Sequence, residues 1–142
     1  MELRVLVADD SAVMRAMVVK SLRLAGLPLG EVHQAADGGE ALRVIEQHWI
    51  DLALLDINMP VMNGEALIEQ VRARPETADL RVVVISTESS DTRIERLRSL
   101  GAGFVRKPFT PEILRRTILE ATGLSDEELR AAAVSGGDGV DF

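Results

Sequence analysis

The sequence predicts an α/β protein in which five parallel strands form one doubly wound sheet, in the order 2-1-3-4-5. Five short segments rich in Val, Ile and Leu recur along the chain, and stretches with the spacing of amphipathic helices separate them. Alternating strands and helices favour a parallel sheet between two helical layers. Because the crossovers of such a sheet are right-handed, few topologies remain, and this strand order is the obvious one.

The expected strands span residues 3–8, 31–35, 52–55, 80–85 and 103–106. The first, third and fourth are almost continuously apolar, which is typical of strands that helices cover on both faces. Each strand is followed by apolar residues with helical spacing. The faces that they form comprise Met14, Met17, Val18 and Leu22; Ala41, Leu42 and Ile45; Leu67, Ile68 and Val71; Ile94 and Leu97; and Ile113, Leu114 and Ile118.

Residues that commonly begin helices stand in front of these faces. Ser11, Asp37 and Asn63 precede the first three helices, and Thr110 with Pro111 opens the fifth. The helical spacing also assigns Met17 to the core, and the simplest role for Trp49, before the third strand, is packing.

The chain divides into a domain of residues 1–123 and a short C-terminal extension of residues 124–142. Ser125 and Glu128 have the spacing of a capping box, which predicts one more short helix. The glycine-rich segment 135–139 predicts a flexible tail after it.

Composition excludes several classes of function. The chain has 142 residues, as expected for one domain, and the absence of cysteine excludes disulfides, thiolate zinc sites and a cysteine nucleophile. A net charge of −7 argues against nucleic-acid binding. No apolar run approaches the roughly 20 residues of a membrane span, and the N-terminus lacks a basic leader, so we expect a cytoplasmic protein without membrane insertion.

Polar residues stand at the carboxyl ends of four expected strands: Asp9 and Asp10, then Asp56, Ser86 and Lys107. These ends share one edge of a parallel sheet, and ligand binding at that edge is already known for the flavodoxin-like order predicted here. Three neighbouring carboxylates repel one another, so either their pKa values rise or a cation neutralises them. With oxygen ligands and no histidine or thiolate nearby, Mg²⁺ fits best.

This combination suits phosphoryl transfer. A carboxylate beside Mg²⁺, a lysine and a hydroxyl is well arranged to attack a phosphoryl group and form an aspartyl phosphate.

The chain resembles the receiver domain of bacterial two-component response regulators over about residues 2–122. The resemblance is carried by the segments Val7-Ala8-Asp9-Asp10-Ser11, Asp56-Ile57-Asn58-Met59-Pro60-Val61-Met62-Asn63-Gly64, Ile85-Ser86-Thr87 and Gly103-Phe104-Val105-Arg106-Lys107-Pro108-Phe109. It implies Asp56 as the phosphoacceptor, and Mg²⁺ on Asp10, Asp56 and the carbonyl of Asn58, with Asp9 acting chiefly through water. Ser86 and Lys107 would hold phosphoryl oxygens, Phe104 would be the aromatic switch, and the Lys107–Pro108 bond would be cis.

The resemblance also bears on the lifetime of the phosphate. In this family, the residues at the positions of Asn58 and Glu88 flank the path of the hydrolytic water. This pair of residues is similar to that of chemotaxis regulators with short-lived phosphates. The family usually has a smaller residue at the position of Thr87. The β-branched side chain of Thr87 is therefore expected to narrow access to the phosphorylation site and to slow self-dephosphorylation.

The predicted function is a free-standing switch without enzymatic activity beyond self-dephosphorylation, in chemotaxis or motility. It would receive phosphate from a sensor histidine kinase and bind a downstream protein through its fourth helix, fifth strand and fifth helix. The alternative is the receiver module of a phosphorelay or transcriptional regulator whose output domain is absent from this chain. A phosphohydrolase of the haloacid-dehalogenase type is disfavoured, because its second aspartate would stand where this chain has Asn58.

Overall fold

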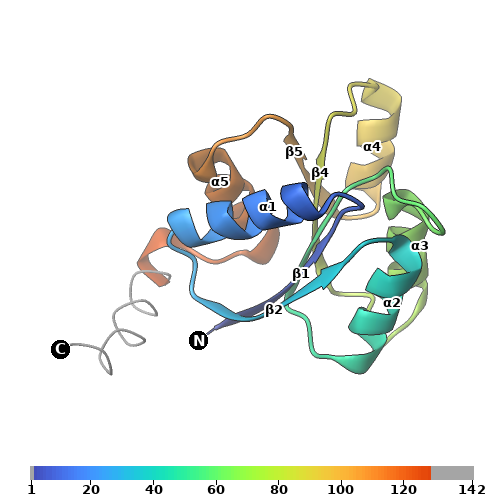
Figure 1. The fold of residues 1–142 in the computed structure, drawn as a ribbon, viewed down its shortest axis with the longest axis horizontal. Coiled ribbons are helices and arrows are strands. Elements are labelled where there is room, and N and C mark those ends of the chain that lie inside the picture. Colours follow the sequence, from blue (N-terminus) through green and yellow to red (C-terminus); the bar gives the residue numbers. More distant parts are fainter. Residues whose placement is uncertain (1, 129–142) are drawn as a thin grey trace.

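The structure, a computed structural model, describes residues 2–128 and contains one parallel sheet in the order β2-β1-β3-β4-β5 (Figure 1). The strands are β1 (Leu3–Ala8), β2 (Leu29–Ala35), β3 (Leu52–Leu55), β4 (Arg81–Ser86) and β5 (Ala102–Arg106). The helices are α1 (Ala12–Leu24), α2 (Gly38–Gln47), α3 (Gly64–Ala73), α4 (Asp91–Ser99) and α5 (Pro111–Thr122). The predicted fold class and strand order are confirmed.

Three strands differ from their predicted bounds by one or two residues. β2 begins at Leu29, which is paired with Leu3, and β4 extends to Ser86, which is paired with Arg106. β5 begins at Ala102 because this residue is paired with Val82. Hydrogen-bonded pairing with a neighbouring strand sets these strand ends, and the apolar character of the sequence alone does not reveal this pairing.

Helices cover both faces of the sheet (Figure 1). On one face, α1 and α5 bury Val18, Leu22, Leu114 and Ile118 against the strands. On the other face, α2, α3 and α4 contribute a second core cluster, which includes Ile68. Both clusters consist of aliphatic side chains almost without contact with water, and their burial is the main term that stabilises the fold.

The predicted caps are confirmed. The side chains of Ser11, Asp37, Asn63 and Thr110 each accept a hydrogen bond from the backbone N–H three residues later. Ser90 does the same for α4, a cap that the sequence analysis did not identify. Each bond satisfies one of the N–H groups that a helix leaves unpaired at its start.

Two packing predictions are wrong. Met17 is 52% exposed, because the buried stripe of α1 runs through Val18 and Leu22, and Met17 lies about 100° away from Val18 around the helix. Trp49 is 71% exposed, and its indole Nε1 donates a hydrogen bond to the carboxylate of Asp51 at 2.9 Å.

The start of the C-terminal extension lies against the domain. Ser125 and Glu128 form the predicted capping box, with bonds of 3.0 and 3.2 Å between each backbone N–H and the other side chain. Arg115 of α5 donates to the carboxylate of Asp126, and Leu124 packs against the core cluster under α1 and α5. The predicted flexible tail lies outside the described residues, and the division at residue 123 stays a prediction.

Within residues 2–128, none of the helices is both long enough and apolar enough to cross a membrane.

Candidate functional site

Backbone hydrogen bonds bring the predicted site residues to one edge of the sheet. The N–H of Asp56 donates to the carbonyl of Ala8 at 2.9 Å, which places Asp56 beside Asp9 at the ends of the central strands. The N–H of Lys107 donates to the carbonyl of Ser86, also at 2.9 Å. Parallel pairing therefore gathers residues that are far apart in the sequence, as predicted.

Three carboxylates converge at this edge. Asp9, Asp10 and Asp56 each place a carboxylate oxygen within 4.8 Å of the others. Asp9 is 4% exposed and Asp56 9%, whereas Asp10 is exposed and lies at the mouth of the cluster. The Nζ of Lys107 lies 3.2 Å from Oδ2 of Asp9 and 3.8 Å from Oδ2 of Asp56, so one ammonium group faces two buried carboxylates.

The electrostatics of Asp56 follow from this arrangement. Burial raises the pKa of its carboxyl group above the usual value, Lys107 opposes this shift, and the charge of Asp9 adds to it. Hydrogen bonds from the backbone N–H groups of Ile57 and Asn58 also lower this pKa, and the bond from Ile57 to Oδ1 is 2.8 Å long. The pKa remains raised because burial outweighs the opposing effects of Lys107 and the two backbone N–H groups.

The donor set fits a hard cation. The three acidic side chains that converge here offer carboxylate oxygens, and Mg²⁺ is commonly bound by one or two carboxylates together with waters. No ion is present in the structure, but oxygens within 4.8 Å of one another can be ligands of a single ion. The two histidines lie elsewhere: the rings of His33 and His48 stack on each other with centroids 4.2 Å apart.

Ser86 and the loop after it border the cluster. Ser86 is fully buried, and its hydroxyl accepts a hydrogen bond of 3.1 Å from the N–H of Glu88. Thr87 is exposed. The Glu88 carboxylate accepts bonds from the Ser90 N–H at 3.0 Å and from the Arg93 guanidinium at 3.1 Å, and these contacts keep the pKa of Glu88 below its usual value.

The two remaining predicted residues lie on either side of this loop. Asn58 is exposed, and its backbone N–H is one of the donors to Asp56. Phe104 is half-buried on β5, where it packs against the core cluster of α2, α3 and α4. The Lys107–Pro108 peptide bond is cis, as the resemblance implies.

The sequence analysis missed Arg15. Its guanidinium donates to the backbone carbonyl of Asp9 at 2.7 Å and to the side chain of Gln34 at 3.0 Å, so it supports the strand end that carries the acidic pair. Its position four residues after the cap Ser11 was the available signal, because residues at that spacing share one face of a helix.

The sequence matches the family described as "Response regulator receiver domain" over residues 5–119. The chain belongs to this family. Receiver domains are signalling switches of two-component systems: they accept phosphoryl groups from histidine kinases, bind Mg²⁺ at an acidic pocket and bind downstream targets.

This receiver domain is similar to proteins with different overall organisation. It is 31% identical to a chemotaxis protein CheY homologue of Campylobacter jejuni, a match that covers 89% of this chain and 97% of that protein. It is 43% identical to a protein-glutamate methylesterase/protein-glutamine glutaminase of Caulobacter vibrioides, over 75% of this chain but only 30% of that protein. Among solved structures, the Vibrio cholerae chemotaxis protein CheY4 aligns with a TM-score of 0.75 and 35% identity, covering 85% and 99% of the two chains.

Proposed function

We propose that this chain is a phosphorylation-controlled switch whose acceptor is Asp56. The observation that carries the proposal is the pair of buried carboxylates, Asp9 and Asp56, with the ammonium group of Lys107 between them and exposed Asp10 beside them. An ammonium group held beside a nucleophilic carboxylate stabilises charge on the oxygens of a transferred phosphoryl group. This edge of the sheet thus combines a nucleophile, Asp56, with a positively charged group, Lys107, that can stabilise the transferred phosphoryl group.

The reaction is phosphoryl transfer from a phosphohistidine of a sensor kinase. A carboxylate oxygen of Asp56 attacks phosphorus, the P–O bond forms, the P–N bond breaks, and the histidine side chain leaves with the electron pair. Lys107 and the hydroxyl of Ser86 hold the transferred oxygens. Mg²⁺, when bound, neutralises their charge; Asp10, Asp56 and the carbonyl of Asn58 would hold it directly, and Asp9 through water.

Mass spectrometry after treatment with acetyl phosphate and Mg²⁺ tests the acceptor. We expect one base-labile phosphoryl group on Asp56, and none on the Asp56→Asn variant, because an amide is a poor nucleophile. Asp10→Ala should keep the fold but weaken Mg²⁺ binding and slow the labelling. Full labelling of Asp56→Asn at another residue would refute the assignment.

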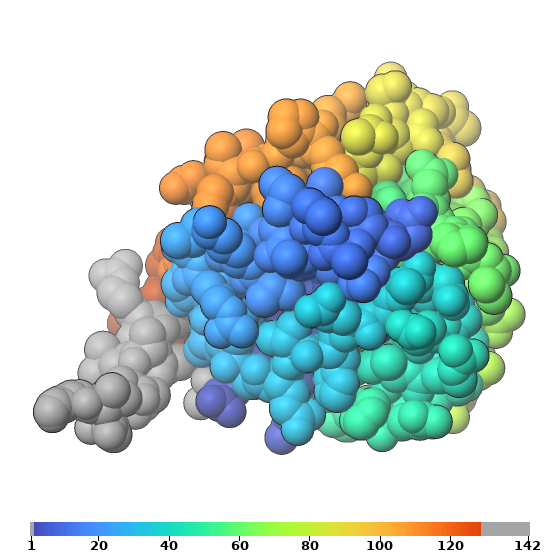
Figure 2. Space-filling view, viewed as in Figure 1, coloured from blue at the N-terminus to red at the C-terminus, as the bar shows by residue number. Residues whose placement is uncertain are grey.

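The exposed face of α1 supports docking of the kinase. Val13, Met17 and Leu24 lie on one side of this helix and are all exposed. The helix begins beside the carboxylates, where the Ser11 N–H donates to Asp9 at 2.9 Å. Figure 2 shows α1 crossing the front of the molecule with nothing over it. A kinase that brings phosphohistidine to Asp56 must contact this rim, and an exposed apolar stripe there is a suitable docking surface.

Comparing two phosphoryl donors isolates the docking step. Met17→Glu should slow transfer from the kinase and leave labelling by acetyl phosphate unchanged, because the small donor needs no docking surface. Leu24→Glu, in the same stripe but about 10 Å farther along the helix from the acidic cluster, should have a smaller effect. Equal losses with both donors would mean that the substitution damages the site itself.

The downstream partner is proposed to bind the face formed by α4, β5 and α5. This face contains a hollow of about 440 Å³ lined by Arg98, Phe104 and Thr117, among others. Phosphorylation would turn the Ser86 hydroxyl toward a phosphoryl oxygen, draw the following loop inward and free space for Phe104 to rotate. The ring carries roughly 150–250 Å² of apolar surface, so its rotation would reshape the hollow.

A beryllofluoride titration followed by NMR tests this readout. Shifts should spread from Asp56 to Ser86, Phe104 and α4, and Ser86→Ala should uncouple Phe104 from the site. An unmoved Phe104 in the loaded wild type would refute the readout while leaving Asp56 as the acceptor.

Chemotaxis or motility is the proposed pathway. The likeness to the Campylobacter CheY homologue over 97% of its length supports a free-standing switch, whereas the methylesterase match covers 30% of its protein. The second candidate is the receiver module of a regulator with a separate output domain. A pull-down from the native cell with beryllofluoride-loaded and metal-only protein distinguishes them: chemotaxis or flagellar proteins captured only by the loaded form favour the first, and capture of transcription machinery favours the second.

A further inference from the structure

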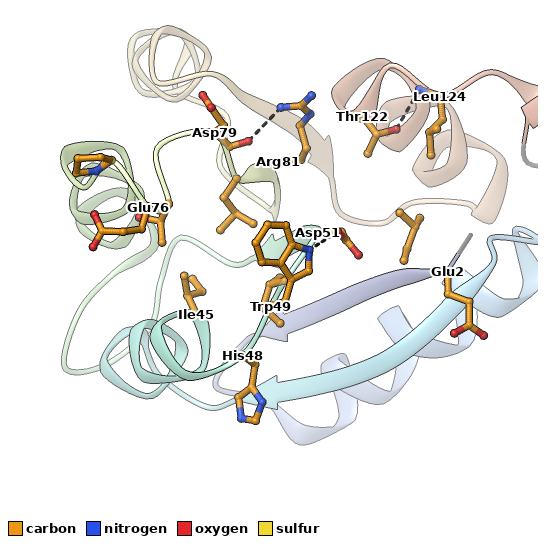
Figure 3. Close-up of a pocket in the computed structure, with 15 residues that line it drawn as sticks. Glu2, Ile45, His48, Trp49, Asp51, Glu76, Asp79, Arg81, Thr122 and Leu124 are labelled. Carbon is orange, nitrogen blue, oxygen red and sulfur yellow. Dashed lines mark hydrogen bonds between the residues drawn. The ribbon is translucent and has the colours of Figure 1, made fainter.

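A second hollow lies at the opposite edge of the sheet, where the strands begin. Its volume is about 490 Å³, within the range of roughly 300–1,000 Å³ for ligand sites (Figure 3). Four separate segments form it: the start of β1, the end of α2 with the loop into β3, the loop before β4, and the end of α5. Leu3 and Ile45, which are both buried, give it an apolar floor.

The wall formed by the loop before β4 is held in place from behind. Arg72 of α3 donates to the carbonyls of Ala78 at 2.9 Å, Leu80 at 2.6 Å and Leu100 at 2.7 Å. The hydroxyl of Thr77 donates to the carbonyl of Val71 at 2.8 Å. The hollow is therefore formed before any ligand arrives, which lowers the entropic cost of binding.

Trp49 stands over this hollow in a fixed orientation. Its Nε1 donates to Oδ1 of Asp51 at 2.9 Å, while Oδ2 of Asp51 accepts the backbone N–H of Arg4 at 2.8 Å. Figure 3 shows the indole among the lining side chains, with its bond to Asp51 dashed. The ring is nevertheless 71% exposed, so this bond holds a large aromatic surface open to solvent.

The charge around the hollow is negative. Four carboxylates line it, from Glu2, Asp51, Glu76 and Asp79, against one guanidinium, that of Arg81. Arg81 donates to the backbone carbonyl of Asp79 at 3.0 Å, and within residues 2–128 neither Glu2, Glu76 nor Asp79 forms a salt bridge. An anionic ligand would be repelled, whereas a cation would meet these carboxylates and the face of an indole, the best of the aromatic rings for cation–π contact.

We propose that this hollow binds an arginine side chain carried by a partner protein. The guanidinium would lie against the Trp49 ring, in a hollow that Glu76 and Asp79 help to make acidic, and the hydrocarbon stem would cover the apolar floor. The site is separate from the phosphorylation edge, so its partner can be bound in either state of Asp56.

The only tryptophan of the chain reports directly on this hollow. The full chain is titrated with acetyl-Leu-Arg-Leu-amide and with its citrulline counterpart, which keeps the shape of arginine but lacks its charge. Trp49 fluorescence and NMR shifts of the lining residues are followed together. We expect a saturable change with the arginine peptide and binding about tenfold weaker with citrulline.

Matched variants separate local charge from net charge. The double variant Glu76→Gln/Asp79→Asn should lose about tenfold in affinity for the arginine peptide. Glu95→Gln/Glu112→Gln, which removes the same charge from exposed positions of α4 and α5, should bind like the wild type. Asp56→Asn should also bind normally, so a failure of this proposal is distinguishable from a failure of the phosphoacceptor assignment.

Three results would overturn the proposal. Equal binding of the arginine and citrulline peptides would show that the charge is not recognised. Equal losses in the two double variants would indicate non-specific attraction to an acidic protein. Protection of Trp49 from acrylamide quenching in the free protein would show that another part of the chain, or a second copy, already fills the hollow.

Discussion

Gly38 and Gly39, the first two residues of α2, offer a controlled test of how tightly this helix packs against the loop of residues 56–63 between β3 and α3. A Cβ on Gly38 would lie 2.0 Å from the backbone carbonyl oxygen of Met62, whereas the nearest neighbours of one on Gly39 would be side-chain atoms, those of Asp37 and Val61 at 3.2 Å. Carbon contacts below 3.0 Å are essentially never found, so Gly38→Ala must push the backbone at Met62 away by about 1 Å.

Both alanine variants gain up to about 1 kcal/mol of helix propensity, but only Gly38→Ala adds an overpacking cost of about 1–3 kcal/mol. We therefore expect Gly39→Ala to match or exceed the wild type in free energy of unfolding, and Gly38→Ala to be the less stable of the two by about 1–3 kcal/mol. Urea unfolding of both variants measures this difference.

The displacement of the backbone at Met62 should also disturb the acidic cluster of Asp9, Asp10 and Asp56. Met62 precedes Asn63, the cap of α3, and the loop that ends there carries Asn58. Gly38→Ala should consequently bind Mg²⁺ more weakly than Gly39→Ala, which a titration followed by NMR checks. If the two variants are equally stable and bind Mg²⁺ equally, the loop is not held by this contact and the reasoning is refuted.

Three further predictions concern charge, access and the wall of the second hollow. Because burial raises the pKa of Asp56, the ionisation of this carboxyl group opposes folding in the metal-free protein. Asp56→Asn should therefore have the higher free energy of unfolding at pH 7, and this difference should vanish as the pH falls below 3.8. A difference that persists below pH 3.8 would contradict the stated cause. Thr87→Ala should shorten the lifetime of the phosphorylated protein in a decay assay, and an unchanged rate would show that Thr87 does not shield the site. Arg72→Met should lower the free energy of unfolding by at least about 1–3 kcal/mol in urea, because the carbonyls of Ala78, Leu80 and Leu100 lose their donor; a near-neutral result would mean that water replaces the guanidinium.

Most of the fold was predictable because its determinants are local or periodic. The apolar runs that became β1 and β3 were found to the residue, since strands covered on both faces are almost continuously apolar, with Arg4 of β1 as the one exposed exception. The convergence of Asp9, Asp56 and Lys107 was predictable because parallel pairing alone decides which strand ends meet.

What the sequence could not predict depends on the direction of individual side chains. Met17 was assigned to the core although the buried stripe of α1 passes beside it, and Trp49 was assigned to packing although a hydrogen bond to Asp51 holds it in solvent. The pairing of Glu88 with Arg93 likewise depends on rotamers that composition and periodicity do not encode.

Asp56, the proposed acceptor, follows a strand that is buried along its whole length and paired on both sides. β3 is only four residues long, all four are buried, and it pairs with β1 on one side and β4 on the other. Amides in such a position exchange with solvent only when the whole domain unfolds, whereas β5 pairs with β4 alone and carries the half-buried Phe104. If Asp56 is phosphorylated as proposed, this strand would be a rigid support beneath it. The proposed signal would then pass through the loop after β4 to β5, which pairs with only one strand and is easier to move.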